Sequence, residues 1–503
     1  MGLFDRARVP VVVPVAPRRT VEAKRSFAAA AFSRLFGAWT TTLVSPDDDL
    51  EMGLQAIRAR SRDLTDNNPL AAAAARAFVE NIAGPNGMLC SPQVTTRTGD
   101  LRSNLNRKLS LWFAEWGQPG TCTMDGRLSW VDLQRLFVRT WRVDGEFFAI
   151  EHRGRGVNRF GYALQPIDAD QVDHNYKRKR TATQNEIRMG VELDAYERPV
   201  AYHVFKEHPS SGNRERERIP ADRMIHCFEQ LRPGQTRGIP AGIAAMARLK
   251  MGDQYDQFEL GAAQLAAGMA VLFKQAAEGP ALVGADGKDL EAEIPLSIEA
   301  MQGKLLPPGV EPFALSAEHP TSAYESFSRA WRRDVGTAYG LAYSTITGDL
   351  TQASYGSLRD GSLKERDLFR GYHRWMGTHF CTRVYRAAME QSALMGAVAL
   401  PNENVDEWSA VAFSGRGWDW IDPSKDIKAT EAEIKLGLTS RQAAAREMGR
   451  NYEDVLRETS EDLASAKEWG VPVDGVEGAK PGAPAAPDVT DTATDGGTNA
   501  GTD

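Results

Sequence analysis

Residues 129–152 read SWVDLQRLFVRTWRVDGEFFAIEH, and the hydrophobic pattern changes within this stretch. Apolar residues recur at helical spacing as far as Trp141. Asp144-Gly145 then interrupts the helix, and Glu146–His152 (EFFAIEH) has the aromatic and branched content of a strand. This junction predicts an α+β fold for the first half of the chain.

The flanking segments extend this pattern in both directions. A helical segment over 49–81 is broken at Asn67-Asn68-Pro69 and stopped by Gly84–Gly87, and a second amphipathic helix is expected over Asn104–Gly117. Beyond the junction, the predicted strands are Tyr162–Ile167, Ile187–Leu193 and Val200–Phe205. Between the first two of these strands, Tyr176–Asn185 is expected to form a hairpin loop.

From residue 242 onward the sequence is mainly helical. Gly242–Gln275 forms one long helical pattern rich in small residues, which suits either a helix packed among copies of itself or a buried helix of one large domain. After the Gly/Pro-rich Gly279–Pro320, the pattern predicts a helix over Ser322–Leu341, a loop at Gly348–Tyr355 and a helix over Gly356–Met395.

The end of the chain predicts three short helices followed by a tail. Pro423 favours the start of the first helix, a capping box from Thr439 to Gln442 the start of the second, and Asn451 the start of the third. Beyond Val471 the sequence has no aromatic residue and one lysine, so it lacks the apolar area needed to order itself.

Composition limits the classes of function. The 503 residues are 42% hydrophobic and 25% charged, and the formal charge is −7. A chain without a basic excess is expected to contact DNA loosely or through a local patch. Four well-separated cysteines give no zinc or redox motif and suit a reducing compartment. Val9–Ala16 is too short to span a bilayer, and no membrane anchor is expected.

No catalytic motif is evident. The chain lacks a GxxxxGK[ST] phosphate loop, a GxSxG elbow and an HExxH pair, so we predict no enzymatic activity, no cofactor and no metal. The most enzyme-like cluster is Asp168–His174 (DADQVDH), which could hold a hard cation in a hydrolase. A polar turn in which aspartates cap backbone amides is the favoured interpretation.

Two segments raise the question of DNA contact. The run Lys177, Arg178, Lys179 and Arg180 could contact phosphate, although such runs are more often solvated loops. Leu438–Arg450 (LTSRQAAAREMGR) is similar to a helix-turn-helix with two short helices, which gives a DNA-binding regulatory protein as the alternative function. Acidic flanks favour helix packing instead.

Seven segments in order carry a resemblance to a known family. They are Arg58–Asn68 (RARSRDLTDNN) leading into Asn81–Gly87 (NIAGPNG), Asp144–Phe148 (DGEFF), Leu164–Asp170 (LQPIDAD), Arg237–Pro240 (RGIP), Thr347–Arg359 (TGDLTQASYGSLR), Gly417–Ala429 (GWDWIDPSKDIKA), and Gly437–Ser440 with Glu447–Gly449. Together the segments resemble the lambda family of phage portal proteins over roughly residues 34–470.

The resemblance implies a structural role in the virion. Portal subunits form a homo-oligomeric ring, usually a dodecamer, at one capsid vertex, and double-stranded DNA passes through the ring non-specifically during packaging and ejection. The implied partners are the terminase large subunit, the major capsid and scaffold proteins, and the head-completion and tail connector proteins. Assembly is expected in the host bacterial cytoplasm.

The resemblance also implies a mainly helical portal fold with a mixed wing, long stem helices, a small clip and a helical crown. Its order assigns 1–45 to an N-terminal arm, 46–240 to the wing, 241–341 to the stem with the clip at about 279–320, 342–400 to the tunnel loop and long helix, 401–470 to the crown and 471–503 to a disordered tail. The tunnel-loop residues expected to face DNA are Asp349, Thr351, Gln352, Ser354 and Tyr355.

Overall fold

The computed structural model describes residues 43–96, 98–99, 101–267, 271–275, 310–314, 323–351, 354–400, 405–418 and 423–470. The chain divides into two units, Met1–Ser45 and Pro46–Asp503, and every element named below belongs to the second. Most of the predicted arm and all of the predicted tail lie outside the described residues. Among the helices that are described, none combines the length and the apolar character needed to span a membrane.

Three helices open the described chain: α1 (Pro46–Glu51), α2 (Leu54–Asn67) and α3 (Pro69–Ile82). The predicted break between the last two is confirmed. The Asn68 side chain accepts hydrogen bonds from the backbone amides of Leu70 and Ala71, and proline occupies the first position of α3. An N-cap asparagine and a first-turn proline both favour a new helix start at this point.

Helices α4 (Ser103–Trp116) and α5 (Trp130–Asp144) match their predictions within three residues. A capping box between Ser129 and Asp132 starts α5, and Gly145 ends it with φ +91°. A Cβ at Gly145 would lie 2.4 Å from the carbonyl carbon of Ile239, so glycine is required for the backbones to approach this closely.

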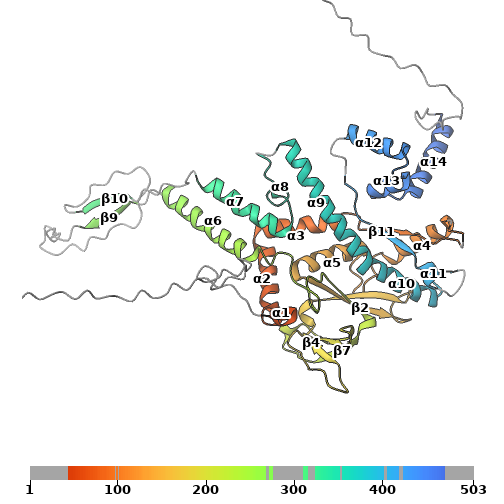
Figure 1. The fold of residues 1–503 in the computed structure, drawn as a ribbon, viewed down its shortest axis with the longest axis horizontal. Helices are drawn as coiled ribbons and strands as arrows, with labels where there is room; N and C mark the ends of the chain where they lie inside the picture. Colours follow the sequence, from red (N-terminus) through yellow and green to blue (C-terminus); the bar gives the residue numbers. More distant parts are fainter. Residues whose placement is uncertain are drawn as a thin grey trace, which may run out of the picture. The chain divides into compact units, whose positions relative to one another are not determined.

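Two of the predicted strands after Gly145 lie at the centre of the fold, together with a third strand that the sequence pattern did not predict. β2 (Glu146–Arg153) pairs antiparallel with both β3 (Tyr162–Ile167) and β8 (Met224–Phe228), in the order β3-β2-β8. Helix α5 packs on β2 and α10 (Thr382–Leu394) packs on β3 (Figure 1). The largest apolar core lies there and includes Trp112, Trp116, Trp130, Trp141, Phe137, Phe147 and Phe380.

A second sheet has the order β4-β5-β6-β7, with β4 (Glu186–Arg188), β5 (Val191–Leu193), β6 (Pro199–Phe205) and β7 (Arg216–Pro220). The prediction of one strand over Ile187–Leu193 is wrong. Met189 and Gly190 have φ of 44° and 81° and form a tight turn, which local hydrophobicity does not reveal. The predicted loop at Tyr176–Asn185 is confirmed by backbone hydrogen bonds between Arg178 and Ile187.

The prediction of an uninterrupted helix over Gly242–Gln275 is also wrong. Helix α6 (Met246–Ala267) ends before β9 (Val271–Gln275), which pairs antiparallel with the distant β10 (Val310–Ala314). This pairing depends on residues about 40 positions away, so periodicity alone could not predict it.

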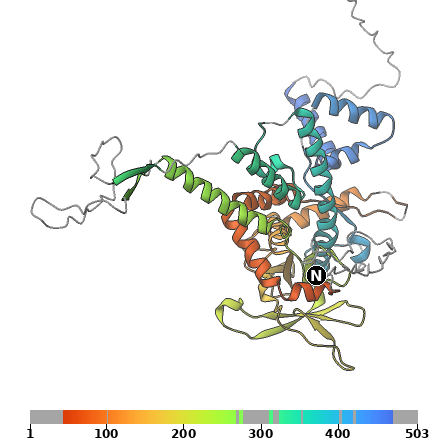
Figure 2. The same ribbon diagram turned by 60° about the vertical axis from the view of Figure 1, so that its left-hand side comes forward.

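Helix α6 contacts α2 and α7 (Ala323–Tyr339), as Figure 2 shows. A Cβ at Gly252 would lie 2.7 Å from the Trp331 indole, so a small residue does allow close helix approach, here within one chain. Between residues 246 and 264, Leu249 and Gly252 are the two that are buried, which excludes the buried-helix interpretation.

The predicted helix over Gly356–Met395 is confirmed in two parts, α9 (Tyr355–Met376) and α10, joined by a π-helical turn at Gly377–Cys381. The short α8 (Tyr343–Thr347) precedes α9, and α11 (Val405–Trp408) follows α10. β11 (Val411–Ser414) pairs antiparallel with the distant β1 (Leu89–Pro92).

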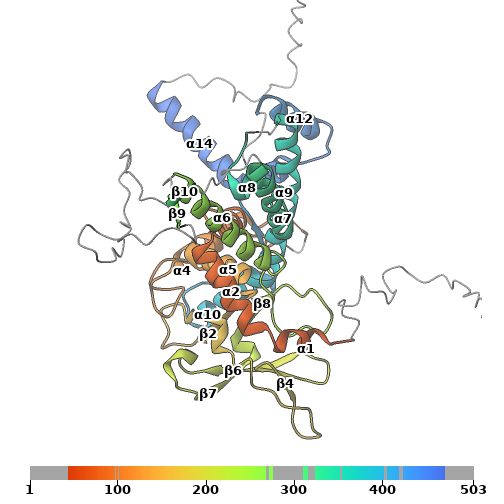
Figure 3. The ribbon, with the colours of Figure 1, turned by 90° about the vertical axis from the view of Figure 1, so that its left-hand side faces the viewer.

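Three helices end the described chain: α12 (Pro423–Lys435), α13 (Arg441–Glu447) and α14 (Tyr452–Trp469). Figure 3 shows α12 beside α9, and Arg359 of α9 lies 3.5 Å from Asp426 of α12. Asn451 caps α14 as predicted. The capping box from Thr439 is wrong, because Ser440 accepts the hydrogen bond from the Ala443 amide.

Candidate functional site

The loop between α8 and α9 is built around Asp349. Gly348 ends α8 in the left-handed region, with φ 70°. The Asp349 carboxylate accepts hydrogen bonds from the Thr351 hydroxyl (2.6 Å) and amide (3.0 Å) and from the Tyr343 hydroxyl (3.0 Å). The Arg329 guanidinium of α7 lies 3.7 Å away. These donors lower the pKa of Asp349 to about 2, and the largest contribution is the hydrogen bond from the Thr351 hydroxyl.

Both ends of this loop are tied to α9. The Ser354 hydroxyl accepts from the Ser357 amide and the Ser357 hydroxyl accepts from the Ser354 amide, which starts α9 with a reciprocal cap. Farther along α9, Glu365 accepts from the Ala342 amide and the Thr345 hydroxyl at the start of α8. Contacts from two different turns of α9 therefore hold the loop and the start of α8 in place.

A cavity of about 250 Å³ adjoins the loop between α7, α8 and α9. Its lining includes Arg329, Arg333, Tyr343, Asp349 and Ser357. The Arg333 guanidinium lies over the Tyr343 ring, 5.6 Å from its centroid. The cavity lining therefore carries two guanidinium groups against one carboxylate.

Of the predicted tunnel-loop residues, the structure brings Asp349 and Thr351 into direct contact and makes Ser354 the cap of α9. Gln352 lies outside the described residues. Tyr355 is the first residue of α9, and its side chain is outside the described part of the chain.

The predicted basic run is largely engaged locally. Lys177 forms an ion pair with Glu51 at 2.5 Å. Arg178 donates to the carbonyl of Asn185, and Arg180 donates to the backbone carbonyls of two residues that end and follow β5. Lys179 is exposed and has no ion pair with any residue that the structure describes.

A charge cluster that the sequence did not predict surrounds Glu146, which is fully buried at the start of β2. Its carboxylate accepts hydrogen bonds from the guanidinium groups of Arg58 and Arg237, from the Gly238 amide and from the His226 imidazole. Arg58 and Arg237 are fully buried as well. Burial raises the pKa of Glu146, but these donors outweigh burial and hold that pKa below its ordinary value.

A second layer of carboxylates surrounds the first. Asp170 lies 2.5 Å from Arg58 and 2.8 Å from Arg62, and Arg62 also pairs with Asp168 and Asp144. Burial raises the pKa of Asp144, and Arg62 offsets this only in part. Arg58 and Arg62 both lie on α2, so this helix is fastened to the sheet by ion pairs.

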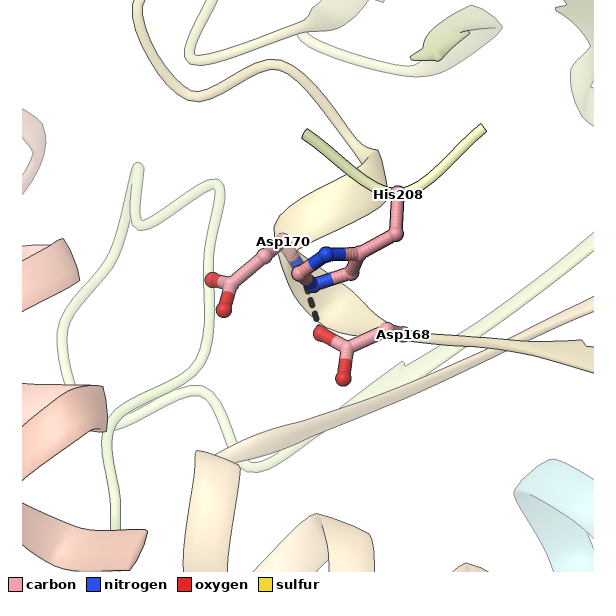
Figure 4. Close-up of side chains that lie close together, drawn as sticks. All are labelled: Asp168, Asp170 and His208. Carbon is pink, nitrogen blue, oxygen red and sulfur yellow. Dashed lines mark hydrogen bonds between the residues drawn. The ribbon is translucent and has the colours of Figure 1, made fainter. Parts of the chain in front are cut away.

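The structure supports the polar-turn interpretation of Asp168–His174. Asp168 caps the turn Ala169–Gln171, and Figure 4 shows the hydrogen bond that it accepts from the Asp170 amide, at 2.8 Å. In place of the predicted His174, the imidazole that approaches both carboxylates is that of His208. Arginines already neutralise both aspartates, so a cation would have to displace them.

Four of the seven segments that carried the resemblance meet at this cluster. Arg58–Asn68 supplies two arginines, Asp144–Phe148 the central glutamate, Leu164–Asp170 two aspartates and Arg237–Pro240 an arginine and an amide. These four segments are far apart in sequence, and the shared charge cluster is the physical reason why all four occur together in the chain.

Two further contacts involve the segment Gly417–Ala429. The Trp418 indole donates to the Asn81 side chain at 3.1 Å, and the His373 ring stacks on Trp418. A Cβ at Gly417 would lie 2.2 Å from the carbonyl carbon of Met448, so Gly417–Ala429 and Glu447–Gly449 touch at a position where only glycine fits.

A sequence model described as the phage portal protein, lambda family, matches residues 32–373, more than half of the chain. The chain belongs to the lambda family of phage portal proteins. The probable portal protein of Halomonas phage phiHAP-1 is 30% identical to this portal protein over 479 residues, which cover 93% of this chain and 92% of that protein. Portal protein B of Escherichia phage lambda is 20% identical over 483 residues, covering 87% and 89% of the two chains.

Two solved structures are also similar to this portal protein. A chain from the virion of a native gene transfer agent particle has a TM-score of 0.45 and 14% identity, covering 79% of this chain and 93% of that one. An HK97 family phage portal protein from Corynebacterium diphtheriae has a TM-score of 0.32 and 10% identity, covering 74% and 98%. Because both TM-scores are below 0.5, these two structures do not contribute to the family assignment, which depends on the sequence comparisons.

Proposed function

We propose that this portal protein forms a ring, of twelve copies, at one vertex of a phage capsid, and that double-stranded DNA enters and leaves through it. The observation that carries this proposal is family membership across nearly the whole chain. In this proposal the ring is a structural conduit without catalysis of its own. It docks the terminase large subunit during packaging, and the head-completion and tail connector proteins afterwards.

The proposed assignment of parts follows chain order. Residues 46–240, with the three-stranded and the four-stranded sheet, form the wing. Helix α6, β9 and α7 belong to the stem, and β10 lies in the clip at about 279–320. The segment α8 to α10 carries the tunnel loop, and α12 to α14 form the crown. The loop residues Asp349, Thr351, Gln352, Ser354 and Tyr355 line the channel.

The charge of the loop supports sliding of DNA. Asp349 is balanced by Arg329 and by three hydrogen-bond donors, so the loop offers DNA neither a strong repulsion nor a fixed cation. A formal charge of −7 for the whole chain acts in the same direction. In the basic run, Lys179 is the residue best able to contact phosphate, because the other three are engaged.

Assembly is tested by electron microscopy and light scattering of the purified full chain. We expect rings with one rotational symmetry, stable without nucleotide. Monomers over a wide concentration range would refute the proposal.

The tunnel loop is tested by Asp349→Ala and Gln352→Ala in a packaging assay. We expect assembled rings and at least a tenfold loss of packaged DNA. Asp360→Ala is the matched control, because Asp360 is an exposed acid on α9 whose ion pair with Lys364 lies within the helix. Full packaging by both loop variants would mean that another segment lines the channel.

The alternative, a sequence-specific DNA-binding regulator, is not favoured by the geometry. Leu438–Arg450 contains one helix, α13, where the motif needs two, and the helix that follows is acidic. A gel shift at physiological salt separates the two functions, because a regulator prefers one sequence and a conduit does not.

A further inference from the structure

The C-terminal helical unit, residues 423–470, is incomplete as a folded body. None of residues 425–470 is buried, whereas each of the helices α2 to α5 buries at least five side chains. Large apolar side chains are instead well exposed on α12, on α14 and in the turns that flank α13: Ile427, Leu436, Leu438, Met448, Leu456 and Trp469, with exposed fractions of 45% to 81%. Helices of this size need a covered apolar face to be stable.

The two halves of this unit carry opposite charge. Residues 423–450 contain six basic and four acidic residues, a formal charge of +2, and residues 451–470 contain two basic and six acidic residues, a formal charge of −4.

The exposed charged residues that form no ion pair within the described chain differ in net sign in the same way, although Glu433 and Glu447 lie in the basic half and Lys467 lies on acidic α14. Lys428, Arg441, Arg446 and Arg450, all before α14, are exposed and form no ion pair with any described residue. On α14, the acids Glu458, Asp462 and Glu468 are likewise exposed and form no ion pair within the described chain. Each copy thus presents a net positive charge on residues 423–450 and a net negative charge on residues 451–470.

We propose that α14 of one copy packs against α12 and α13 of the next copy, so that the C-terminal unit completes its fold only when neighbouring copies meet. The inference rests on the proposed ring. A contact between two different surfaces of the same chain is heterologous, and such contacts close into rings when the rotation fits. Opposite charges select this pairing over α14 against α14, where acids would face acids.

A cross-linking experiment identifies the occupant of the surface. The full chain carrying Arg446→Cys and Glu458→Cys is assembled, its ring is confirmed by mass photometry, and a short bismaleimide is added. We expect a ladder of covalent multimers on a denaturing gel. A chain with Arg446→Cys and Lys364→Cys, which places the second thiol on exposed α9, is the control and is expected to remain monomeric on the gel. Intact rings of the first variant that yield monomers alone would overturn the inference.

Hydrogen exchange of the unaltered protein keeps the inference testable if the cysteine variants fail to fold. Amides of residues 423–470 are expected to exchange at least tenfold more slowly in the ring than in dissociated monomers, while amides of β2 and β3 exchange equally in both. Equal exchange of residues 423–470 in both states would overturn the coupled folding and leave the ring intact. A chain that never forms a ring would instead refute the proposed function.

Discussion

At the scale of single residues, the fold depends on Glu146. Its carboxylate lies between two fully buried guanidinium groups, and the arginines come from segments before and after the sheet. Removing one member of a buried ion pair leaves an uncompensated charge in a region that water does not reach. The position of Glu146 at the head of a strand that otherwise begins with apolar residues, EFFAI, was the one signal in the sequence that could have indicated such a role.

Replacing Glu146 with glutamine should therefore destabilise the chain by about 3–5 kcal/mol, because Arg58 and Arg237 lose their counter-charge. Chemical denaturation followed by tryptophan fluorescence measures the change. The control is Glu115→Gln, which removes an exposed pair with Arg159 and should cost about 0–1 kcal/mol. Equal losses for the two variants would contradict the central role of Glu146.

The same cluster should make stability sensitive to acid. The pKa values of Glu146 and Asp170 are lower in the folded chain than the ordinary values of about 4.3 and 3.9, so their contribution is present above those values and is lost as the pH falls. We expect the unfolding temperature to fall below about pH 5, and Glu146→Gln to flatten that dependence. Asp144, whose pKa is raised, acts in the opposite direction. An unchanged pH profile in the variant would show that other groups are responsible.

At the scale of elements, capping residues determine where helices start and end. Whether a segment between two such ends is helix or strand also depends on its tertiary contacts. Asn68, Ser129 and Asn451 cap helices as their residue types favour. Met189-Gly190 and Val271–Gln275 departed from prediction because a tight turn and a distant strand partner override periodicity.

Asn68→Ala should cost about 1 kcal/mol, because the first amides of α3 lose their acceptor. Asn67→Ala is the matched control, since the Asn67 side chain makes an exposed hydrogen bond to Asp63 within α2. Thermal unfolding of both variants tests the cap, and an equal shift in the two would argue against it.

At the scale of the whole molecule, assembly is proposed to depend on the surfaces of residues 46–470. The sequence beyond them has no aromatic residue and offers little apolar area to bury. Truncation after Gly470 should therefore leave the ring, seen by electron microscopy, and the unfolding temperature unchanged within about 1 °C. A truncated chain that stays monomeric would show that the tail takes part in assembly.

The amino-acid sequence determined the α+β class, most helix boundaries and the family, because capping residues, apolar periodicity and ordered motifs are local properties of the chain. It also indicated the loop around Asp349, although not its contacts with Tyr343 and Arg329. Only the tertiary structure showed that Arg58, Glu146, Asp170 and Arg237 form one cluster, because ion pairing between residues up to 112 positions apart leaves no periodic signal. The family segments are distant in sequence, but four of them meet in the charge cluster around Glu146.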